Sequence, residues 1–187
     1  MASQAARTYT YEDLLSFPED DGILREIIDG ELVLTPSPIL LHQRVLTRLT
    51  SAFFEYVKKH GGEVVGASVD HFIEATNVIA PDLIYVREEH LDRLEGRYMA
   101  SPPDLAVEIS SPSTRRRDLG RKKELYESFG VEEYWFVDLE NEQVVLHHIA
   151  DGYGNPVIYG LSEKVASLAA PGLEIAVTEL LVFPRRS

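Results

Sequence analysis

The sequence predicts an α/β (α+β) fold, in which a mixed β-sheet is flanked by helices and preceded by an N-terminal hairpin. Two stretches, residues 40–59 and 114–130, carry apolar residues at the spacing of amphipathic helices. Short apolar runs of strand length lie before, between and after these stretches. Asp29-Gly30 separates two such runs, which is a strong hairpin signal. Strands that flank two substantial helices favour a layered fold with a mixed sheet.

The N-terminal elements follow from caps, turns and periodicity. Thr10, with Asp13 three residues later, is expected to cap a short helix that runs to Phe17. The hairpin occupies the stretch LREIIDGELVLTP, residues 24–36. A long helix extends from Leu40 to about residue 59 and stops at a Gly-Gly pair. Its apolar positions are Leu41, Val45, Leu49, Phe53, Tyr56 and Val57.

The rest of the chain alternates between strands and helical segments. A helical turn is expected near residues 91–94, and the second long helix begins at Ser113 or Thr114 and ends at Gly130. The segment TELLVF predicts a closing helical turn. Strands are predicted in EVVGASVDHFIE, APDLIYVREEH, LAVEI, PGLEIAV and EEYWFVDLENEQVVLHHI, the last being a hairpin that turns near Glu140-Asn141.

Composition indicates a folded soluble protein and excludes several kinds of site. The chain has 187 residues, 44% hydrophobic and 26% charged, so we expect a single domain across residues 1–187. It has no cysteine, which excludes disulfides, thiol nucleophiles and cysteine-ligated zinc. No apolar run approaches the roughly 18 residues of a membrane helix, and the first residues lack the apolar core of a secretory signal. We therefore expect a cytoplasmic protein with no membrane partner.

The charge balance limits how the chain can bind a polyanion. Its net charge of −13 argues against a protein wrapped uniformly by nucleic acid, because phosphate binding needs a positive surface. Nucleic acid would have to meet a local basic patch or a site neutralised by a metal ion. The one dense basic segment is Arg115-Arg116-Arg117, followed by Arg121-Lys122-Lys123.

Two carboxylates fall within predicted strands. Glu108 lies inside the apolar run LAVEI, on the same face of the strand as Ala106. Asp82 follows Pro81 and opens the run DLIYV. Carboxylates beside an apolar sheet are costly unless a cation or a metal ion pairs with them. Taken singly, Asp82 also fits a strand-end cap, and Glu108 fits a buried salt bridge.

A lysine on the second long helix is a candidate partner for Glu108. At about 100° per residue, Lys122 lies near the centre of the apolar stripe of this helix and so faces the sheet. The alternative is a lysine whose stem lies along the core while its ammonium reaches water. The stripe is defined by Leu119, Leu125, Tyr126 and Phe129.

Together, Asp82, Glu108 and Lys122 suit metal-dependent hydrolysis of a phosphodiester. Two carboxylates hold Mg²⁺ or a similar hard cation, with water completing its shell. The metal polarises the phosphodiester and lowers the pKa of the attacking water. The lysine orients that water or stabilises charge in the transition state.

Four segments resemble the Uma2 family, also known as DUF820, within the restriction-endonuclease-like PD-(D/E)XK superfamily: REIIDGEL, PDLIYV, PPDLAVEISSPST and RDLGRKKELYESFGVEEYWFVD. The resemblance runs from about Tyr11 to the final LEIAVTELLVF, practically the whole chain. It implies a restriction-endonuclease-like core, a nuclease that uses Mg²⁺ or Mn²⁺, and DNA as the partner. It also implies a homodimer, since two sites are needed to cut both strands of a duplex.

The superfamily pattern is an aspartate after a proline on one strand, then Asp/Glu-x-Lys on the next. Asp82 and Glu108 match the two acidic positions, whereas Ser110 stands where the lysine is expected. The resemblance therefore implies a lysine that has moved to the following helix, and the helix phase independently points to Lys122.

Further candidates come from segments that resemble the family. Glu31 in DGEL is a candidate metal or water contact, with an exposed strand glutamate as the alternative. His42 near the start of the first long helix is a candidate accessory residue, although such a histidine more often makes a local hydrogen bond. The run Arg115-Arg116-Arg117 is a candidate phosphate contact, with a solvated helix start as the alternative.

The leading hypothesis is a metal-dependent endonuclease acting on DNA. A second hypothesis is a catalytically inactive nuclease-fold protein that binds nucleic acid or a protein partner, which the acidic net charge and Ser110 favour. A third is a carboxylate-pair hydrolase acting on small substrates such as glycosides.

Overall fold

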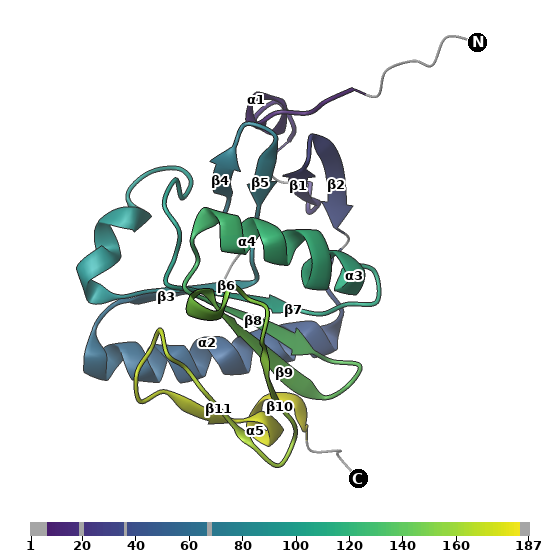
Figure 1. The fold of residues 1–187 in the computed structure, drawn as a ribbon. Coiled ribbons are helices and arrows are strands. Elements are labelled where there is room, and N and C mark those ends of the chain that lie inside the picture. The colour runs from purple at the N-terminus through teal and green to yellow at the C-terminus, as the bar shows by residue number, and fades with distance from the viewer. Residues whose placement is uncertain (1–6, 19–20, 36, 67–68, 184–187) are drawn as a thin grey trace.

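The strands of the chain form three sheets, and helices cover the largest of them (Figure 1). The computed structural model describes residues 7–18, 21–35, 37–66 and 69–183. The strands are β1 (Leu24–Ile28), β2 (Glu31–Thr35), β3 (Glu63–Val65), β4 (His71–Glu74), β5 (Asn77–Ile79), β6 (Leu83–Val86), β7 (Leu105–Ile109), β8 (Glu133–Asp138), β9 (Gln143–His148), β10 (Val157–Tyr159), β11 (Lys164–Ala166) and β12 (Glu174–Ala176).

The helical segments are fewer and mostly short. The α-helices are α1 (Tyr11–Leu14), α2 (Leu40–His60), α3 (Arg115–Arg117), α4 (Lys123–Phe129) and α5 (Val177–Leu181). Two 3₁₀ turns, η1 (Glu88–Leu94) and η3 (Ile149–Asp151), and a π-helical turn, η2 (Asp118–Lys122), complete them. In the part of the chain described, no helix combines the length and apolarity that crossing a bilayer requires.

The main sheet has the strand order β10-β9-β8-β7-β6-β3 and is mixed. Strands β7 and β8 run parallel, and the segment α3–η2–α4 connects them. The other neighbours in this sheet are antiparallel. The predicted α+β class, with a mixed sheet flanked by helices, is confirmed.

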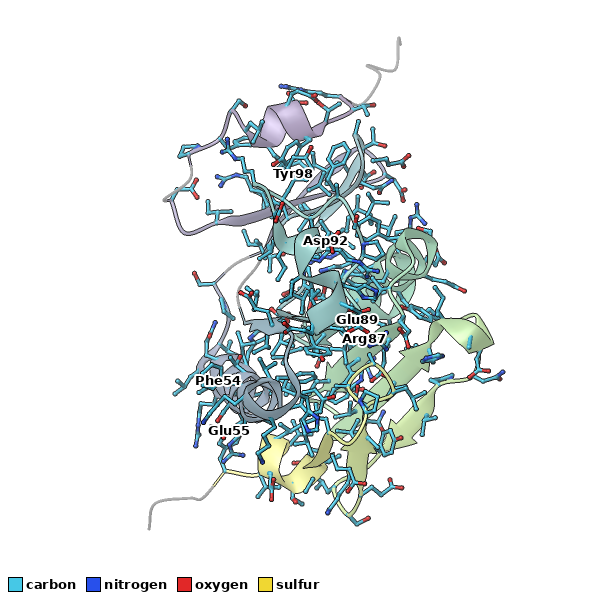
Figure 2. The ribbon with its side chains drawn as sticks, turned by 90° about the vertical axis from the view of Figure 1, so that its left-hand side faces the viewer. Phe54, Glu55, Arg87, Glu89, Asp92 and Tyr98 are labelled. Atoms are coloured by element: carbon cyan, nitrogen blue, oxygen red, sulfur yellow. The ribbon has the colours of Figure 1, made fainter. Side chains whose placement is uncertain are left out.

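The two faces of the main sheet pack against different helices (Figure 1). On one face, Val45 and Phe53 of α2 pack with Val107 and Trp135 of the sheet. On the other face, Tyr126 of α4 and Ala106 of β7 belong to one buried cluster. This assignment follows from strand alternation, because odd and even residues of β7 point to opposite faces. The outer side of α2 carries the exposed residues Phe54 and Glu55 (Figure 2).

A second sheet, of order β2-β1-β5-β4, stands next to the main one (Figure 1). The hairpin β1–β2 forms as the Asp29-Gly30 pair predicts, with both turn residues at positive φ, 52° and 77°. The chain passes from β5 to β6 through residues 80–82, which brings this sheet beside the end of β7. A third sheet pairs β11 with β12.

Several predicted elements differ from those observed. EVVGASVDHFIE is two strands, β3 and β4, in different sheets, so the prediction of one strand is wrong; residues 67–68 between them lie outside the described part. Strands β5, β10 and β11 have only three residues each, too few for an alternation pattern to identify them. The capping box of Thr10 and Asp13 is confirmed, but α1 ends at Leu14 rather than Phe17.

The second predicted long helix is interrupted. It consists of α3, a π-helical turn and α4, and it ends at Gly130, whose φ of 93° is the left-handed cap conformation. Thr114 precedes the helix, but its side chain does not cap it. The π turn matters for the site, because two of the residues that face the sheet lie within it.

Candidate active site

A cavity of about 490 Å³ lies where the β1–β2 hairpin, the start of α2 and the end of β7 meet. The three residues singled out by the strand and helix patterns, Asp82, Glu108 and Lys122, all line it. Glu108 comes from β7, Lys122 from η2 and Asp82 from the connection just before β6, and the loop between β7 and α3 closes one side. Such a concave site with converging polar groups is the usual form of a ligand site.

Glu108 and Lys122 meet directly. The ammonium of Lys122 forms an ion pair with Oε1 of Glu108, and both side chains are buried, 3% and 6% exposed. The phenol of Tyr126 donates a hydrogen bond of 2.5 Å to the same oxygen. The orientation predicted from the helix phase is confirmed, because Lys122 faces the sheet rather than solvent. Lysine is rarely so buried unless it is paired.

A second carboxylate, which the sequence analysis missed, also contacts Lys122. Oε1 of Glu26, on β1, lies 2.8 Å from the ammonium and accepts a 2.9 Å hydrogen bond from the backbone N–H of Ala80. Glu26 is only 1% exposed. In the sequence, Glu26 shows the same pattern as Glu108, an acid within a short apolar run. The ammonium therefore sits between carboxylates from two different sheets.

Asp82 is held by two partners through one oxygen. Its Oδ2 accepts a 2.7 Å hydrogen bond from the backbone N–H of Ile109 and lies 3.1 Å from Nε2 of His42. It therefore does cap the end of β7 while its side chain stays 19% exposed to the cavity. No described residue bonds its Oδ1. His42, buried in the first turn of α2, thus orients Asp82, and its own Nδ1 lacks a partner in the described part of the chain.

The π turn adds a further acid to the cavity wall. Asp118 and Lys122, four residues apart, are 1% and 2% exposed and face inward together. Neither carboxylate oxygen of Asp118 has a hydrogen-bond partner among the described residues. π turns within α-helices occur frequently at functional sites. Asp118 was not singled out from the sequence, since an aspartate after three arginines resembles an ordinary helix-start residue.

Burial and neighbouring charges shift the pKa values of these groups. Burial raises the pKa of Glu108 well above its usual value, although Lys122 opposes this. Burial also raises the pKa of Asp118, again against Lys122. For Lys122, burial alone would lower the pKa, but Glu108, Glu26 and Asp118 outweigh it and the pKa is raised. The lysine is therefore a permanent ammonium, whereas Glu108 and Asp118 hold their protons to a higher pH than usual.

The charges at the cavity do not balance when all groups are ionised. The carboxylates of Glu26, Asp82, Glu108 and Asp118 contribute four negative charges, against two positive charges from Lys122 and Arg117. Two negative charges remain on largely buried side chains, which is costly. Protons or a divalent cation can neutralise them.

The donor set fits a hydrated hard cation. Oδ1 of Asp82 and Oε2 of Glu108 make no hydrogen bond to a described residue, so each leaves a carboxylate oxygen available. Within the described ranges, no three His, Asp or Glu side chains form a ready-made metal cage. Mg²⁺ commonly needs only one or two protein carboxylates, with water and phosphate oxygens completing its octahedron.

Glu31 does not reach this cavity. It is exposed beside the hairpin turn, where it pairs with Ile28, and it is not among the cavity-lining residues described. Alternation explains the difference: on β1 the inward position is Glu26, whereas Glu31 opens β2 with its side chain toward solvent. The expectation of Glu31 as a metal contact is replaced by Glu26 as a contact of Lys122.

The arginine run divides into three different environments. Arg115 pairs with Asp138 at 2.5 Å and with Glu140 at 3.3 Å, away from the cavity. Arg116 is exposed. Arg117 lines the cavity, and contacts the hydroxyl of Thr35 and the carboxylate of Glu26 at 3.2 and 3.8 Å.

A family model and a solved structure match the chain. The model described as "Uma2: Putative restriction endonuclease" covers residues 10–178. The chain belongs to the Uma2 family. A crystal structure from Anabaena variabilis ATCC 29413, titled as a putative nuclease belonging to DUF820, is similar with a TM-score of 0.74 and 18% sequence identity. The match covers 91% of this chain and 96% of that one. No match is found among curated proteins.

Uma2 membership and the fold agree with the resemblance seen in the sequence. At 18% identity the solved structure shows the fold alone, while the family description supports nuclease function and the general use of divalent metal ions. Ser110 marks the departure from the usual superfamily motif: its hydroxyl accepts a 2.9 Å hydrogen bond from the N–H of Leu139. In this Uma2 chain Ser110 thus has a structural role, and the nearby ammonium comes from Lys122.

Proposed function

We propose that this Uma2 protein is a metal-dependent endonuclease that hydrolyses phosphodiester bonds in DNA. The observation that carries the proposal is the contact of Lys122 with Glu108 on the wall of a cavity that also exposes Asp82. Family membership supports the reaction class. Metal dependence and the choice of DNA are our inferences from the donor set and the resemblance.

Each side chain has a definable task in this reaction. Asp82 and Glu108 would hold Mg²⁺ or Mn²⁺, and the ion supplies Lewis acidity toward the phosphate and the attacking water. The Ile109 N–H and His42 fix Asp82 through Oδ2. Lys122, fixed between Glu26 and Glu108, places a positive charge where the attacking water or the developing phosphate charge would lie.

Charge neutralisation gives the ion an energetic reason to bind. The excess of two negative charges among the cavity residues equals the charge of one divalent cation. Without the ion, burial raises the pKa of Glu108, so this carboxylate takes up a proton at a higher pH than usual, and a protonated carboxyl is a poor ligand. Ion binding should therefore release a proton and become tighter as the pH rises.

Calorimetry with Mn²⁺ tests the metal site independently of cleavage. We expect the wild type to bind Mn²⁺ and Glu108→Gln to lose that binding, because the substitution removes one charged ligand. Glu55→Gln is the matched control, since Glu55 is exposed on the outer face of α2 (Figure 2). Wild type without saturable binding, or Glu108→Gln with unchanged affinity, would rule out the proposed site.

A nuclease-fold protein that binds nucleic acid without cutting it is the competing function. Two observations favour it: Ser110 occupies the superfamily lysine position, and two carboxylates already hold the Lys122 ammonium. Strand cleavage is the measurement that distinguishes the two functions. Metal binding and nucleic-acid binding without strand cleavage would support the competing function and contradict ours.

A further inference from the structure

The proposed site lies below the molecular surface. The side chains of Asp82, Glu108 and Lys122 are 19%, 6% and 3% exposed. A phosphate that contacts all three must therefore enter the cavity rather than touch its rim. The rim comes from the β1–β2 hairpin, the start of α2 and the loop after β7.

The cavity has the size of a small-molecule site. Its volume of about 490 Å³ falls within the roughly 300–1,000 Å³ typical of pockets for small ligands. A DNA duplex is a rigid rod whose major groove alone is about 12 Å wide, and its stacked bases cannot follow a phosphate into such a space. An unpaired nucleotide can leave the stack and enter a pocket of this kind.

The remaining residues that line the cavity suit a base and a sugar. Apolar side chains offer flat contacts of the sort that hold an unstacked base. Hydroxyl and amide groups beside them can pair with base edges or sugar oxygens. The apolar group contains Leu24, Ile39, Leu46 and Pro112, and the polar group contains Thr35, Ser37, Gln43, Ser111 and Ser113.

Within the described part of the chain, two arginines of the basic segment are already paired with acids and are not free for a duplex. Duplex binding commonly neutralises about 6–10 phosphates. Here Arg115 is paired with Asp138 and Glu140, and Arg121 with Asp29 and Glu124. Their charges are already compensated in a chain of net charge −13.

From these observations we infer that the cavity receives one unpaired nucleotide, so the substrate is single-stranded DNA or an unpaired segment within a duplex. The inference rests on the proposed function and specifies its substrate class. A single-strand substrate also removes the need for a second active site to cut the opposite strand.

The direct experiment compares three DNAs that share one labelled strand, in Mn²⁺, with the 187-residue chain. They are the strand alone, the strand paired with its full complement, and the strand paired with a complement that leaves an internal segment unpaired. The single strand should be cut at least about tenfold faster than the full duplex, because extracting a nucleotide from a duplex costs free energy. Cuts in the third DNA should fall in the unpaired segment.

A variant that narrows the cavity mouth gives an independent check. Gln43 is exposed on α2 and lines the cavity without contacting the proposed catalytic groups. Because the larger ring would obstruct the entry of a nucleotide, Gln43→Trp should slow single-strand cleavage by about tenfold. Mn²⁺ binding should stay unchanged. The matched control is Ser51→Trp, which adds the same ring to an exposed position of α2 away from the cavity. Equal rates for wild type and both variants would contradict the inference.

The outcomes of the cleavage assay distinguish the inferred single-strand substrate from the proposed nuclease function. A full duplex cut as fast as the single strand would overturn the inference and leave the metal-dependent nuclease intact. Absence of cleavage on all three DNAs would overturn the nuclease function and the inference with it.

Discussion

At the scale of single residues, the site is an ammonium enclosed by carboxylates. Lys122 is 2% exposed and is held by Glu26 and Glu108, which are 1% and 5% exposed. Removing one member of a buried ion pair leaves the partner charged and unsolvated, which costs far more than losing a surface pair. Stability measurements can therefore show how strongly these groups are coupled.

Lys122→Met should destabilise the fold by about 3–5 kcal/mol, because Glu26 and Glu108 would face each other without a cation. Urea denaturation measures the change in the free energy of unfolding. Lys164→Met is the control: Lys164 forms only a 3.6 Å surface pair with Glu174 and is 65% exposed. The control should change stability by less than about 1 kcal/mol. Equal effects of the two substitutions would mean that the buried cluster is not energetically coupled.

Asp118→Asn should stabilise the protein at neutral pH by about 0.5–2 kcal/mol, the usual gain from a single stabilising substitution. Burial raises the pKa of Asp118, so the folded state holds its proton to a higher pH than the unfolded state. Stability from this group is thus present below the unfolded pKa and lost as pH rises through the folded pKa. Melting temperatures across a pH series should show the variant's advantage at neutral pH and its disappearance in acid. An advantage that persists in acid would contradict this cause.

At the scale of elements, the π turn between α3 and α4 carries Asp118 and Lys122 to the cavity. Gly120 lies inside this turn, outside the left-handed φ region and with open space where a Cβ would lie. Gly130 ends α4 at a φ of 93°, which side chains rarely adopt. The same substitution should therefore have opposite effects at these two glycines.

Gly120→Ala should stabilise the protein by about 0.5–1 kcal/mol, because alanine restricts the unfolded chain without a clash. Gly130→Ala should destabilise it by at least a similar amount, because the left-handed cap excludes a Cβ. Thermal unfolding of both variants gives the comparison. A loss of stability in Gly120→Ala would show that the π turn needs glycine for its geometry.

The local sequence pattern was sufficient to predict the elements whose apolar residues repeat regularly over a long stretch. The helix of residues 40–60 and the inward phase of Lys122 could be predicted because several apolar positions repeat at one spacing. The π turn could not, since an insertion in the hydrogen-bond ladder leaves no clear mark on a short apolar stripe. The separation of β3 from β4 depends on pairing with β6 and β5, which local sequence does not reveal.

At the scale of the whole molecule, the site is assembled from segments far apart in the chain. Glu26 reaches Lys122 only because two sheets meet beside the end of β7. Sequence patterns identify each charged residue in an apolar run, but they do not say which runs become neighbours. Asp82 and Glu108 were identifiable because each is an acid at or within an apolar run and the family resemblance named both positions; that β6 and β7 are adjacent and antiparallel is seen only in the structure.

The net charge of −13 predicts weak salt dependence of nucleic-acid binding. In the run Arg115-Arg116-Arg117, only Arg115 is paired with described acids outside the cavity. Arg116 and Arg117 can therefore neutralise about two phosphates. With a slope of about −0.7 per phosphate on a single strand, the logarithm of the binding constant should fall with a slope near −1.4 against the logarithm of salt. Fluorescence anisotropy in Ca²⁺ measures this slope. A slope steeper than about −4 would indicate a broad basic surface instead.

The central claim is that Asp82, Glu108 and Lys122 form one metal-dependent phosphodiesterase site. Cleavage of labelled DNA by wild type, Asp82→Ala and Asp92→Ala, with Mn²⁺ and with a chelator, tests it most directly. Asp92 is exposed on η1, outside the cavity, and serves as the control (Figure 2). Cleavage by wild type and Asp92→Ala only with Mn²⁺, and its loss in Asp82→Ala, is the result we predict. Undiminished cleavage by Asp82→Ala, or cleavage in the chelator, would contradict the account.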